Sequence, residues 1–268
     1  MKYKMLVLDM DDTLLTDDHK ISTRNKEMLM KAQDMGVYVV LASGRPTPAM
    51  ESFAKELELK RYGSYMLSYN GAVITDMKHE QIIFEQSLSM GDIHALYDFS
   101  VRHKVHILTY VDGSIVAETD SQYIDMETHI TGMPHRKVDS FKKAVNSSAI
   151  KCLLLEEPSY LKEVEGILKK AMPHKSVTTS KPFFLEVMQM GIDKAASLAR
   201  LSGKLQIDAS EIIAVGNASN DLTMVEYAGL GVWVDNVSPE LRHRANVVVA
   251  SNNDDGVAEV VERFILNV

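Results

Sequence analysis

The chain contains very little cysteine and no long apolar run, and each absence excludes a class of protein. Its 268 residues include a single cysteine, Cys152, so neither a disulfide framework nor a thiolate zinc site can be built. The first apolar run is too short for a signal peptide, and no later run is long enough to span a membrane. We therefore expect a soluble cytoplasmic protein in which Cys152 is a buried apolar side chain.

Basic residues are also scarce relative to acidic ones. The chain has 29 Lys and Arg residues against 37 Asp and Glu, a formal net charge of −8. General nucleic-acid binding requires a basic face and is disfavoured, whereas a small phosphorylated metabolite needs only local positive charge. Among nine histidines, His103 and His106 are three apart, but they straddle an expected helix-to-strand boundary. A histidine metal site is therefore disfavoured.

Two parts of the chain alternate short β-branched or aliphatic runs with helical patterns. Strands are expected at residues 5–8, 37–41, 65–68, 212–215, 230–234 and 247–249. Helices are expected at about 23–35, 48–58, 193–201, 220–228, 239–245 and 255–264. Such alternation is typical of an α/β fold, here a doubly wound parallel sheet.

The pattern changes between these two parts. Ser89 and Asp92 form a capping-box pattern before a helix, and Asp112-Gly113 separates two apolar runs, which indicates a hairpin. A further strand, a helix at about 158–171 and two strands near Val177 and Phe183 follow. We expect an inserted α+β domain at 84–189 and a discontinuous core domain at 1–83 and 190–268, which suits this chain length.

The first group of polar residues is Asp-Met-Asp-Asp-Thr, residues 9–13, directly after the first expected strand. In open α/β sheets, ligands bind beyond the carboxyl ends of the strands. A carboxylate there can attack phosphorus if a cation offsets the repulsion, and Mg²⁺ prefers oxygen ligands. A second carboxylate can transfer protons. Taken alone, the segment is better explained as a solvated acidic turn.

Three later groups follow other expected strands or begin helices. Ser43-Gly44-Arg45 offers a hydroxyl, backbone amides and a guanidinium for an anion. Lys194 begins a helix, where a cation is disfavoured unless it faces an anion. The segment from Gly216 to Asp221 offers amide and carboxylate oxygens. Taken alone, Ser43-Gly44-Arg45 is better explained as an ordinary turn with a serine cap. Lys194 alone can be an exposed lysine, and the last segment alone can be a helix cap. One sheet edge, however, would gather all four groups.

In this order, the four segments resemble the haloacid dehalogenase superfamily of phosphohydrolases, most closely its Cof-type branch with its sugar phosphatases. The matching segments are DMDDTLL, ASGRP, YNGA, GIDKAASL, NDLTMVEYAG and NNDDGVA. The resemblance runs nearly from end to end. It implies a Rossmann-like core with an α/β cap domain that selects the substrate.

The resemblance also implies roles for individual residues. Asp9 would be the nucleophile and a magnesium ligand, and Asp11 the general acid and base, with its carbonyl on the metal. Lys194 would neutralise charge, and Asp221 would support the metal. The phosphate and substrate would be held by Met10, Ser43, Gly44, Arg45, Asn70, Lys194 and Asn220.

Two residues depart from the family pattern. Asp12 stands where glycine is usual, and Asn217 stands where a metal-ligand aspartate is usual. Asn217 keeps an oxygen donor but lacks the negative charge, so weaker magnesium binding is expected. The implied function is a magnesium-dependent phosphatase for small phosphorylated metabolites, sugar phosphates first. A phosphomutase and a non-catalytic metabolite-binding protein remain alternatives, and the oligomeric state stays open, a homo-oligomer included.

Overall fold

The structure is a computed structural model that describes residues 2–267. Residue contacts divide the chain into two units, a core unit (Met1–Phe84 and Asp193–Val268) and an inserted unit (Glu85–Ile192). The predicted boundaries at 83/84 and 189/190 lie within three residues of this division. Among the described residues, no helix is both long and apolar enough to cross a bilayer.

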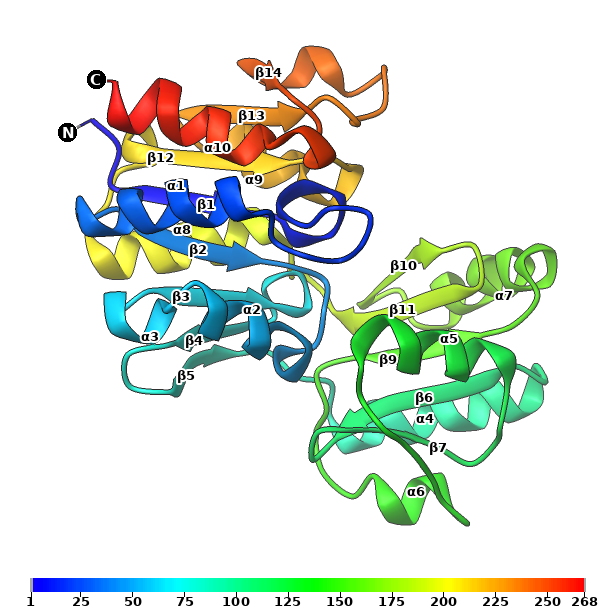
Figure 1. The fold of residues 1–268 in the computed structure, drawn as a ribbon. Helices are drawn as coiled ribbons and strands as arrows, with labels where there is room; N and C mark the ends of the chain where they lie inside the picture. Colours follow the sequence, from blue (N-terminus) through cyan, green and yellow to red (C-terminus); the bar gives the residue numbers. More distant parts are fainter. Residues whose placement is uncertain (1, 268) are drawn as a thin grey trace. The chain divides into compact units, whose positions relative to one another are not determined.

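An eight-stranded sheet forms the centre of the core unit, in the order β14-β13-β12-β1-β2-β3-β4-β5 (Figure 1). The strands are β1 (Met5–Leu8), β2 (Tyr38–Ala42), β3 (Tyr65–Ser68), β4 (Val73–Asp76), β5 (Gln81–Glu85), β12 (Ile212–Gly216), β13 (Leu230–Val234) and β14 (Val247–Val249). The six strands from β14 to β3 pair in parallel, and β4 pairs antiparallel with β3. The predicted α/β fold with a largely parallel sheet is confirmed.

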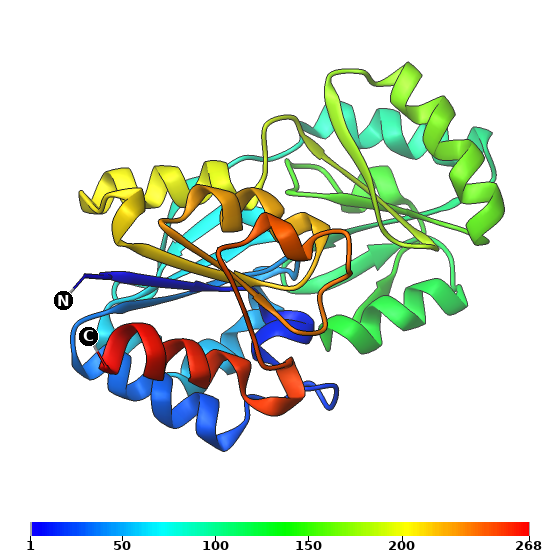
Figure 2. The ribbon, with the colours of Figure 1, turned by 90° about the horizontal axis from the view of Figure 1, so that it is seen from above.

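Helices cover both faces of this sheet, as the view in Figure 2 shows. The helices are α1 (Thr23–Asp34), α2 (Glu51–Glu56), α3 (Leu59–Tyr62), α8 (Lys194–Leu205), α9 (Leu222–Tyr227) and α10 (Gly256–Val261). Alternate residues of β1 point to opposite faces. Leu6 and Leu8 join a cluster with α1 and α10, whereas Met5 and Val7 join a cluster with α8 and α9. The central strand is therefore buried on both sides, as expected for parallel strands.

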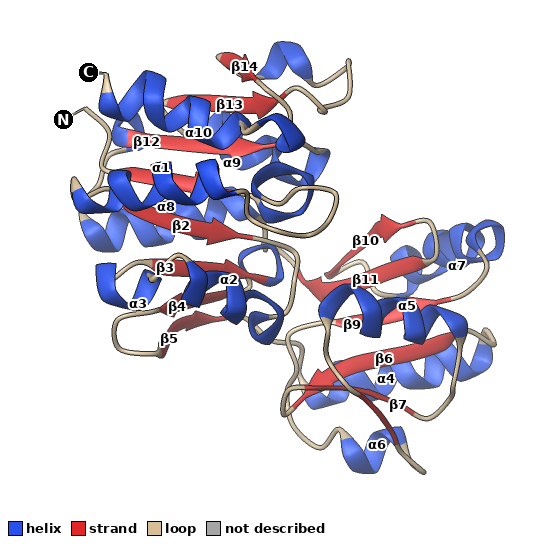
Figure 3. Ribbon diagram, in the orientation of Figure 1, coloured by secondary structure: helices blue, strands red, loops and turns tan. Residues whose placement is uncertain are grey.

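A second sheet forms the inserted unit, in the order β10-β11-β9-β6-β7-β8 (Figure 3). Its strands are β6 (His106–Val111), β7 (Ser114–Ala117), β8 (His135–Lys137), β9 (Cys152–Leu155), β10 (Lys175–Lys181) and β11 (Phe184–Gln189). All pairs are antiparallel except β7 with β8. Its helices are α4 (Met90–Arg102), α5 (Gln122–Thr131), α6 (Phe141–Ala144) and α7 (Pro158–Ala171). This is the α+β arrangement predicted for the insertion, and Cys152 lies buried in it.

Two predicted helices are wrong in extent. Residues 239–245 form turns and only a short 3₁₀ helix (Arg242–Arg244), and the expected helix at 48–58 is split into a 3₁₀ turn (Thr47–Met50) and α2. In the second case, the chain first forms a turn at Ser43. Pro46 and Pro48 then fix the φ angles at the start of the helical segment. No sequence pattern predicted α5, α6, β5 or β8.

Candidate active site

A buried ion-pair triad lies at the carboxyl edge of the core sheet. Asp9 follows β1, Lys194 begins α8, and Asp221 closes the short turn after β12. The Lys194 ammonium donates to Asp9 Oδ1 at 2.5 Å and to Asp221 Oδ1 at 2.6 Å. The Lys194 side chain is fully buried, and both carboxylates are nearly so. Two residues that are 185 positions apart in the sequence therefore form one charged centre.

The triad changes the proton affinities of its members. Burial, followed by repulsion from Asp221, raises the pKa of Asp9 to about 7, because these effects outweigh the attraction of Lys194. Burial alone would lower the pKa of Lys194, but Asp221 and Asp9 outweigh it and hold that pKa above its usual value. Lys194 therefore stays protonated, and an added cation would favour the ionised form of Asp9.

The segment after β12 holds Asp221 in place through its backbone. The amides of Asn217 and Ala218 donate to Asp221 Oδ2 at 3.0 and 3.1 Å. Asp221 packs directly against Gly216, where any Cβ atom would clash with its side chain. Both carboxylate oxygens of Asp221 are thus already engaged, which suits a supporting role better than direct contact with a ligand. Asn217 is half-buried beside it.

Asp11 is engaged by Arg45 rather than by Lys194. The Arg45 guanidinium donates from Nε to Asp11 Oδ2 at 2.9 Å and from Nη2 to Asp11 Oδ1 at 2.6 Å, a two-point pair. The Arg45 side chain is 9% exposed and that of Asp11 is 41% exposed. His19 Nδ1 also lies 3.9 Å from Asp11 Oδ1. No sequence pattern pointed to His19, which comes from the loop before α1.

The turn after β2 is joined to the turn after β3. The Ser43 hydroxyl accepts from the Arg45 amide at 3.1 Å, and the Ser43 carbonyl accepts from the Asn70 amide at 2.8 Å. The Asn70 side-chain amide lies against Gly44, with Oδ1 3.3 Å from where a Cβ would stand. This Oδ1 is buried and has no hydrogen-bond partner among the described residues. Ser43, Gly44 and Asn70 therefore form one cluster.

The remaining predicted residues, Met10 and Asn220, lie in the turns that also carry Asp9 and Asp221. Met10 is buried in the turn after β1, and Asn220 is exposed in the turn before α9. Asp12 has φ 57°, in the left-handed region, and its carbonyl accepts from the Asn236 side chain at 2.7 Å. Glycine adopts this conformation most readily and aspartate is among the better substitutes, so Asp12 can hold the backbone shape for which the sequence resemblance implied a glycine.

The donor atoms at this edge suit a magnesium ion. Mg²⁺ is usually bound by one or two carboxylates, with waters and substrate phosphate completing its shell. Asp9, the Asp11 carbonyl and the Asn217 side chain would supply hard oxygen donors, with Asp221 behind them. Residues 2–267 contain no cluster of three or more His, Cys, Asp or Glu side chains arranged to hold a metal. A site that relies on a backbone carbonyl and an amide would not form such a cluster.

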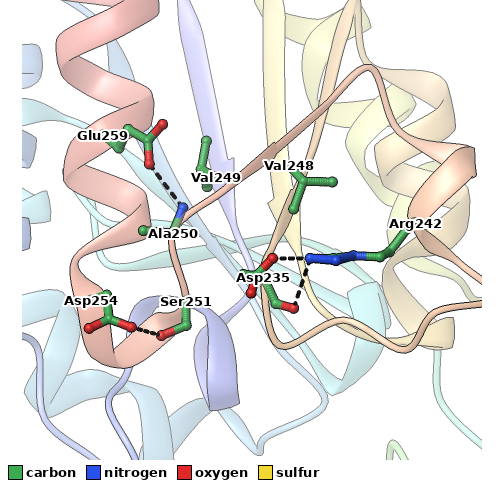
Figure 4. Close-up of a pocket in the computed structure, with 8 residues that line it drawn as sticks. All are labelled: Asp235, Arg242, Val248, Val249, Ala250, Ser251, Asp254 and Glu259. Atoms are coloured by element: carbon green, nitrogen blue, oxygen red, sulfur yellow. Dashed lines mark hydrogen bonds and ion pairs between the residues drawn. The ribbon is translucent and has the colours of Figure 1, made fainter.

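A separate surface pocket of about 650 Å³ lies beside the ends of β13 and β14 (Figure 4). It contains none of the predicted site residues. Its charged groups are engaged locally: Arg242 pairs with Asp235, Asp254 accepts from Ser251, and Glu259 accepts from the Ala250 amide.

Comparisons with known proteins identify the family of this chain. Residues 6–261 match the family model of haloacid dehalogenase-like hydrolases. The Bacillus subtilis protein named "Putative phosphatase YxeH" is 31% identical over 98% of this chain and 99% of its own length. The 5-amino-6-(5-phospho-D-ribitylamino)uracil phosphatase YcsE of Bacillus subtilis is 28% identical over 98% and 96%.

Solved structures agree as well. A haloacid dehalogenase-like hydrolase from Bacteroides thetaiotaomicron superposes with a TM-score of 0.95 at 35% identity, over 98% of this chain and 100% of its own. The sequence-based family prediction is confirmed: the chain belongs to the haloacid dehalogenase-like hydrolases, among relatives that are named phosphatases.

Proposed function

We propose that this protein is a magnesium-dependent phosphatase that forms an aspartyl phosphate on Asp9 and hydrolyses small phosphorylated metabolites. The observation that carries the proposal is the buried contact between Lys194 and Asp9. A buried lysine beside a buried carboxylate offsets the repulsion that the carboxylate would meet on approaching a phosphate dianion. This pair lies at the carboxyl edge of the sheet, where open α/β folds bind their ligands.

In the first step, an Asp9 carboxylate oxygen attacks phosphorus, and the bond between phosphorus and the substrate oxygen breaks. Asp11 gives a proton to that leaving oxygen, so the product leaves as an alcohol. In the second step, Asp11 takes a proton from water, whose oxygen attacks phosphorus and releases inorganic phosphate from Asp9. For the first step, Asp11 has to be protonated and turned away from Arg45, whose guanidinium is then available to an anionic substrate.

The other site residues bind and orient the phosphoryl group. The Met10 amide, Ser43, Gly44 and Asn220 would donate to its oxygens, and Lys194 would offset its charge. When bound, Mg²⁺ would supply further positive charge beside the reacting oxygens. Asp9, the Asp11 carbonyl and Asn217 would hold it, with Asp221 supporting this set.

The inserted unit is the proposed source of substrate selectivity, with Arg45 and Asn70 contributing from the core unit. The relative YcsE is named for a substrate that carries a phosphoribityl group. We extend this to phosphorylated sugars and sugar derivatives as the substrate class. Nucleic acid and membrane surfaces are not proposed partners, because the chain carries a formal charge of −8.

The direct test measures hydrolysis of p-nitrophenyl phosphate with Mg²⁺ by Asp9→Asn and by the wild type. Loss of the nucleophile should lower kcat by at least about 10³-fold. Asp12→Asn is the matched control, because it makes the same change at an exposed neighbour, and asparagine also tolerates positive φ. Equal rates for wild type and Asp9→Asn would refute the proposed nucleophile.

Asn217 supports one second candidate, a metabolite-binding protein without turnover. It would bind phosphorylated sugars but would release no inorganic phosphate from them, whatever the magnesium concentration. A panel of sugar phosphates, assayed by phosphate release and in parallel by calorimetric binding, distinguishes the two functions. Binding without phosphate release throughout the panel would favour the second candidate.

A further inference from the structure

One buried hydroxyl joins two separate parts of the candidate active site. Ser197 lies one helical turn after Lys194 on α8 and is 3% exposed. Its Oγ donates to the Gly71 carbonyl at 2.5 Å. Gly71 belongs to the turn after β3, so this bond connects the helix that carries Lys194 to a different element.

The turn packs against α8 so closely that it tolerates only glycine. Gly71 has φ 95°, and a Cβ there would clash with the Ser197 side chain and stand 3.1 Å from the Asp193 carbonyl oxygen. The preceding residues, Tyr69 and Asn70, also have positive φ values of 52° and 55°. Consecutive left-handed residues other than glycine are unfavourable, so the surrounding contacts must hold this turn in shape.

The other side of the same turn holds the Ser43 segment. The Asn70 amide donates to the Ser43 carbonyl at 2.8 Å, and the Tyr69 amide donates to the Arg45 carbonyl at 2.9 Å. A continuous path therefore runs from Lys194 through Ser197 and Gly71 to Asn70 and Ser43. Each step in it is a covalent segment or a hydrogen bond.

We propose that Ser197 is a positioning residue, which fixes the Lys194 ammonium relative to the phosphate-binding turn at Ser43 and Gly44. This inference rests on the proposed phosphatase function. Reacting groups must be aligned closely, and a displacement of about 1 Å can lower a rate by about 100-fold. Ser197 touches no reacting atom and acts only through α8 and the Gly71 turn.

The same helix provides a matched control. Ser202 is 1% exposed, and its Oγ donates to the Ala199 carbonyl at 3.2 Å within α8. It also lies 3.1 Å from the Tyr227 hydroxyl, which is away from the Gly71 turn. Ser197→Ala and Ser202→Ala thus each remove a buried hydroxyl from α8, but only the first breaks the link to the Gly71 turn.

The test compares kcat for p-nitrophenyl phosphate at saturating Mg²⁺ in the two variants, with urea midpoints measured alongside. We expect similar losses of midpoint but at least about a fivefold lower kcat for Ser197→Ala than for Ser202→Ala. Ser197→Cys keeps a weaker donor and should give an intermediate kcat. If Ser197→Ala does not fold, the Cys variant is compared with Ser202→Ala on the same criterion.

A kcat ratio below about fivefold overturns the positioning role. If the wild type is inactive, or as active as Asp9→Asn, the proposed function itself is refuted. If the wild type is far more active than Asp9→Asn but the two serine variants have similar kcat, only the role of Ser197 is refuted. Because a general loss of folding would lower the activity of both alanine variants, the ratio between them isolates the positioning effect.

Discussion

Asn217 is the residue whose chemistry departs furthest from the rest of the candidate site. Its backbone amide supports Asp221, but its side chain brings an amide oxygen where the sequence resemblance implied a metal-ligand carboxylate. An aspartate at this position would add one negative charge beside the proposed metal site without changing side-chain length. The cost of asparagine should therefore appear in metal affinity.

We predict that Asn217→Asp lowers the magnesium concentration for half-maximal activity by about 10- to 100-fold, the range typical for changed groups around a metal. Magnesium titrations of p-nitrophenyl phosphate hydrolysis by both proteins measure this directly. Asn253→Asp, a change of the same type in the turn before α10, is the control and should leave the titration unchanged. Superimposable titration curves for wild type and Asn217→Asp would contradict the prediction that Asn217 weakens magnesium binding.

Glu127 on α5 is a buried carboxyl group of the inserted unit. It is 5% exposed, and its Oε1 accepts from the Tyr110 hydroxyl at 2.5 Å. Burial raises its pKa, although nearby Lys151 and the Tyr110 hydrogen bond oppose that shift. Folding therefore favours the protonated form of Glu127.

This shift predicts that the difference in free energy of unfolding between wild type and Glu127→Gln depends on pH. The pKa of Glu127 is higher in the folded protein than in the unfolded chain. Its stabilising contribution to folding is therefore complete at pH values below the pKa of the unfolded chain. It is lost as pH rises through the folded pKa. The free energy of unfolding of the wild type should thus fall relative to that of Glu127→Gln as pH rises from about 4 toward 8. Urea denaturation across that range tests it, with the exposed Glu163→Gln as control. A constant difference would contradict the shift.

At the scale of elements, two glycines should respond oppositely to alanine. Gly203 lies within α8, and a Cβ there would meet no atom within 4 Å. Gly203→Ala should therefore raise the free energy of unfolding by about 0.5–1 kcal/mol. Gly231 lies in β13, where a Cβ would clash with the Val225 carbonyl oxygen of α9. Gly231→Ala should destabilise by about 1–3 kcal/mol.

Both changes are measured by urea denaturation of the full chain. A stabilising Gly231→Ala would mean that α9 can move away from the sheet at little cost. A destabilising Gly203→Ala would mean that the end of α8 is held by contacts other than its own helical hydrogen bonds.

Elements with strong periodicity or clear caps were predictable from sequence. Ser89 caps α4 through its side chain and completes a capping box with Asp92, as the sequence pattern predicted. The helix α5 was missed because its buried face includes Glu127 and Thr131, which breaks the apolar period. The expected helix at 239–245 was wrong because tertiary contacts, including Trp233 Nε1 with the Leu241 carbonyl, hold that segment in turns.

For the candidate site, strand ends predicted which segments meet, but not how their side chains pair. Parallel strands place Asp9, Ser43 and Asn217 at one edge, and this follows from topology alone. The pairing of Asp11 with Arg45 and the contact between Ser197 and Gly71 depend on side-chain conformations and on helix placement. Local sequence carries no signal for either.

At the scale of the whole molecule, the inserted unit should fold by itself. It is a continuous segment, and the two apolar clusters of its sheet are built from residues 85–192 only. We predict that a protein of residues 85–192 shows a cooperative urea transition by circular dichroism. Leu154→Ala, at a fully buried position of β9, should lower its free energy of unfolding by about 2–5 kcal/mol. A gradual, non-cooperative transition would show that this segment needs the rest of the chain.

The central strand of the core sheet has a consequence for synthesis on the ribosome. Met5 of β1 pairs with Tyr38 on one side but with Ile212 on the other. The partners on one edge of β1 therefore become available only after about four fifths of the chain has been translated. During that interval, one edge of β1 lacks its native neighbour β12. The inserted segment is translated after β1, but all of its own sheet partners are present before β12 is made, so it can fold earlier than the core unit. The N-terminal segment of the nascent chain, which is translated first, should therefore depend most on chaperones.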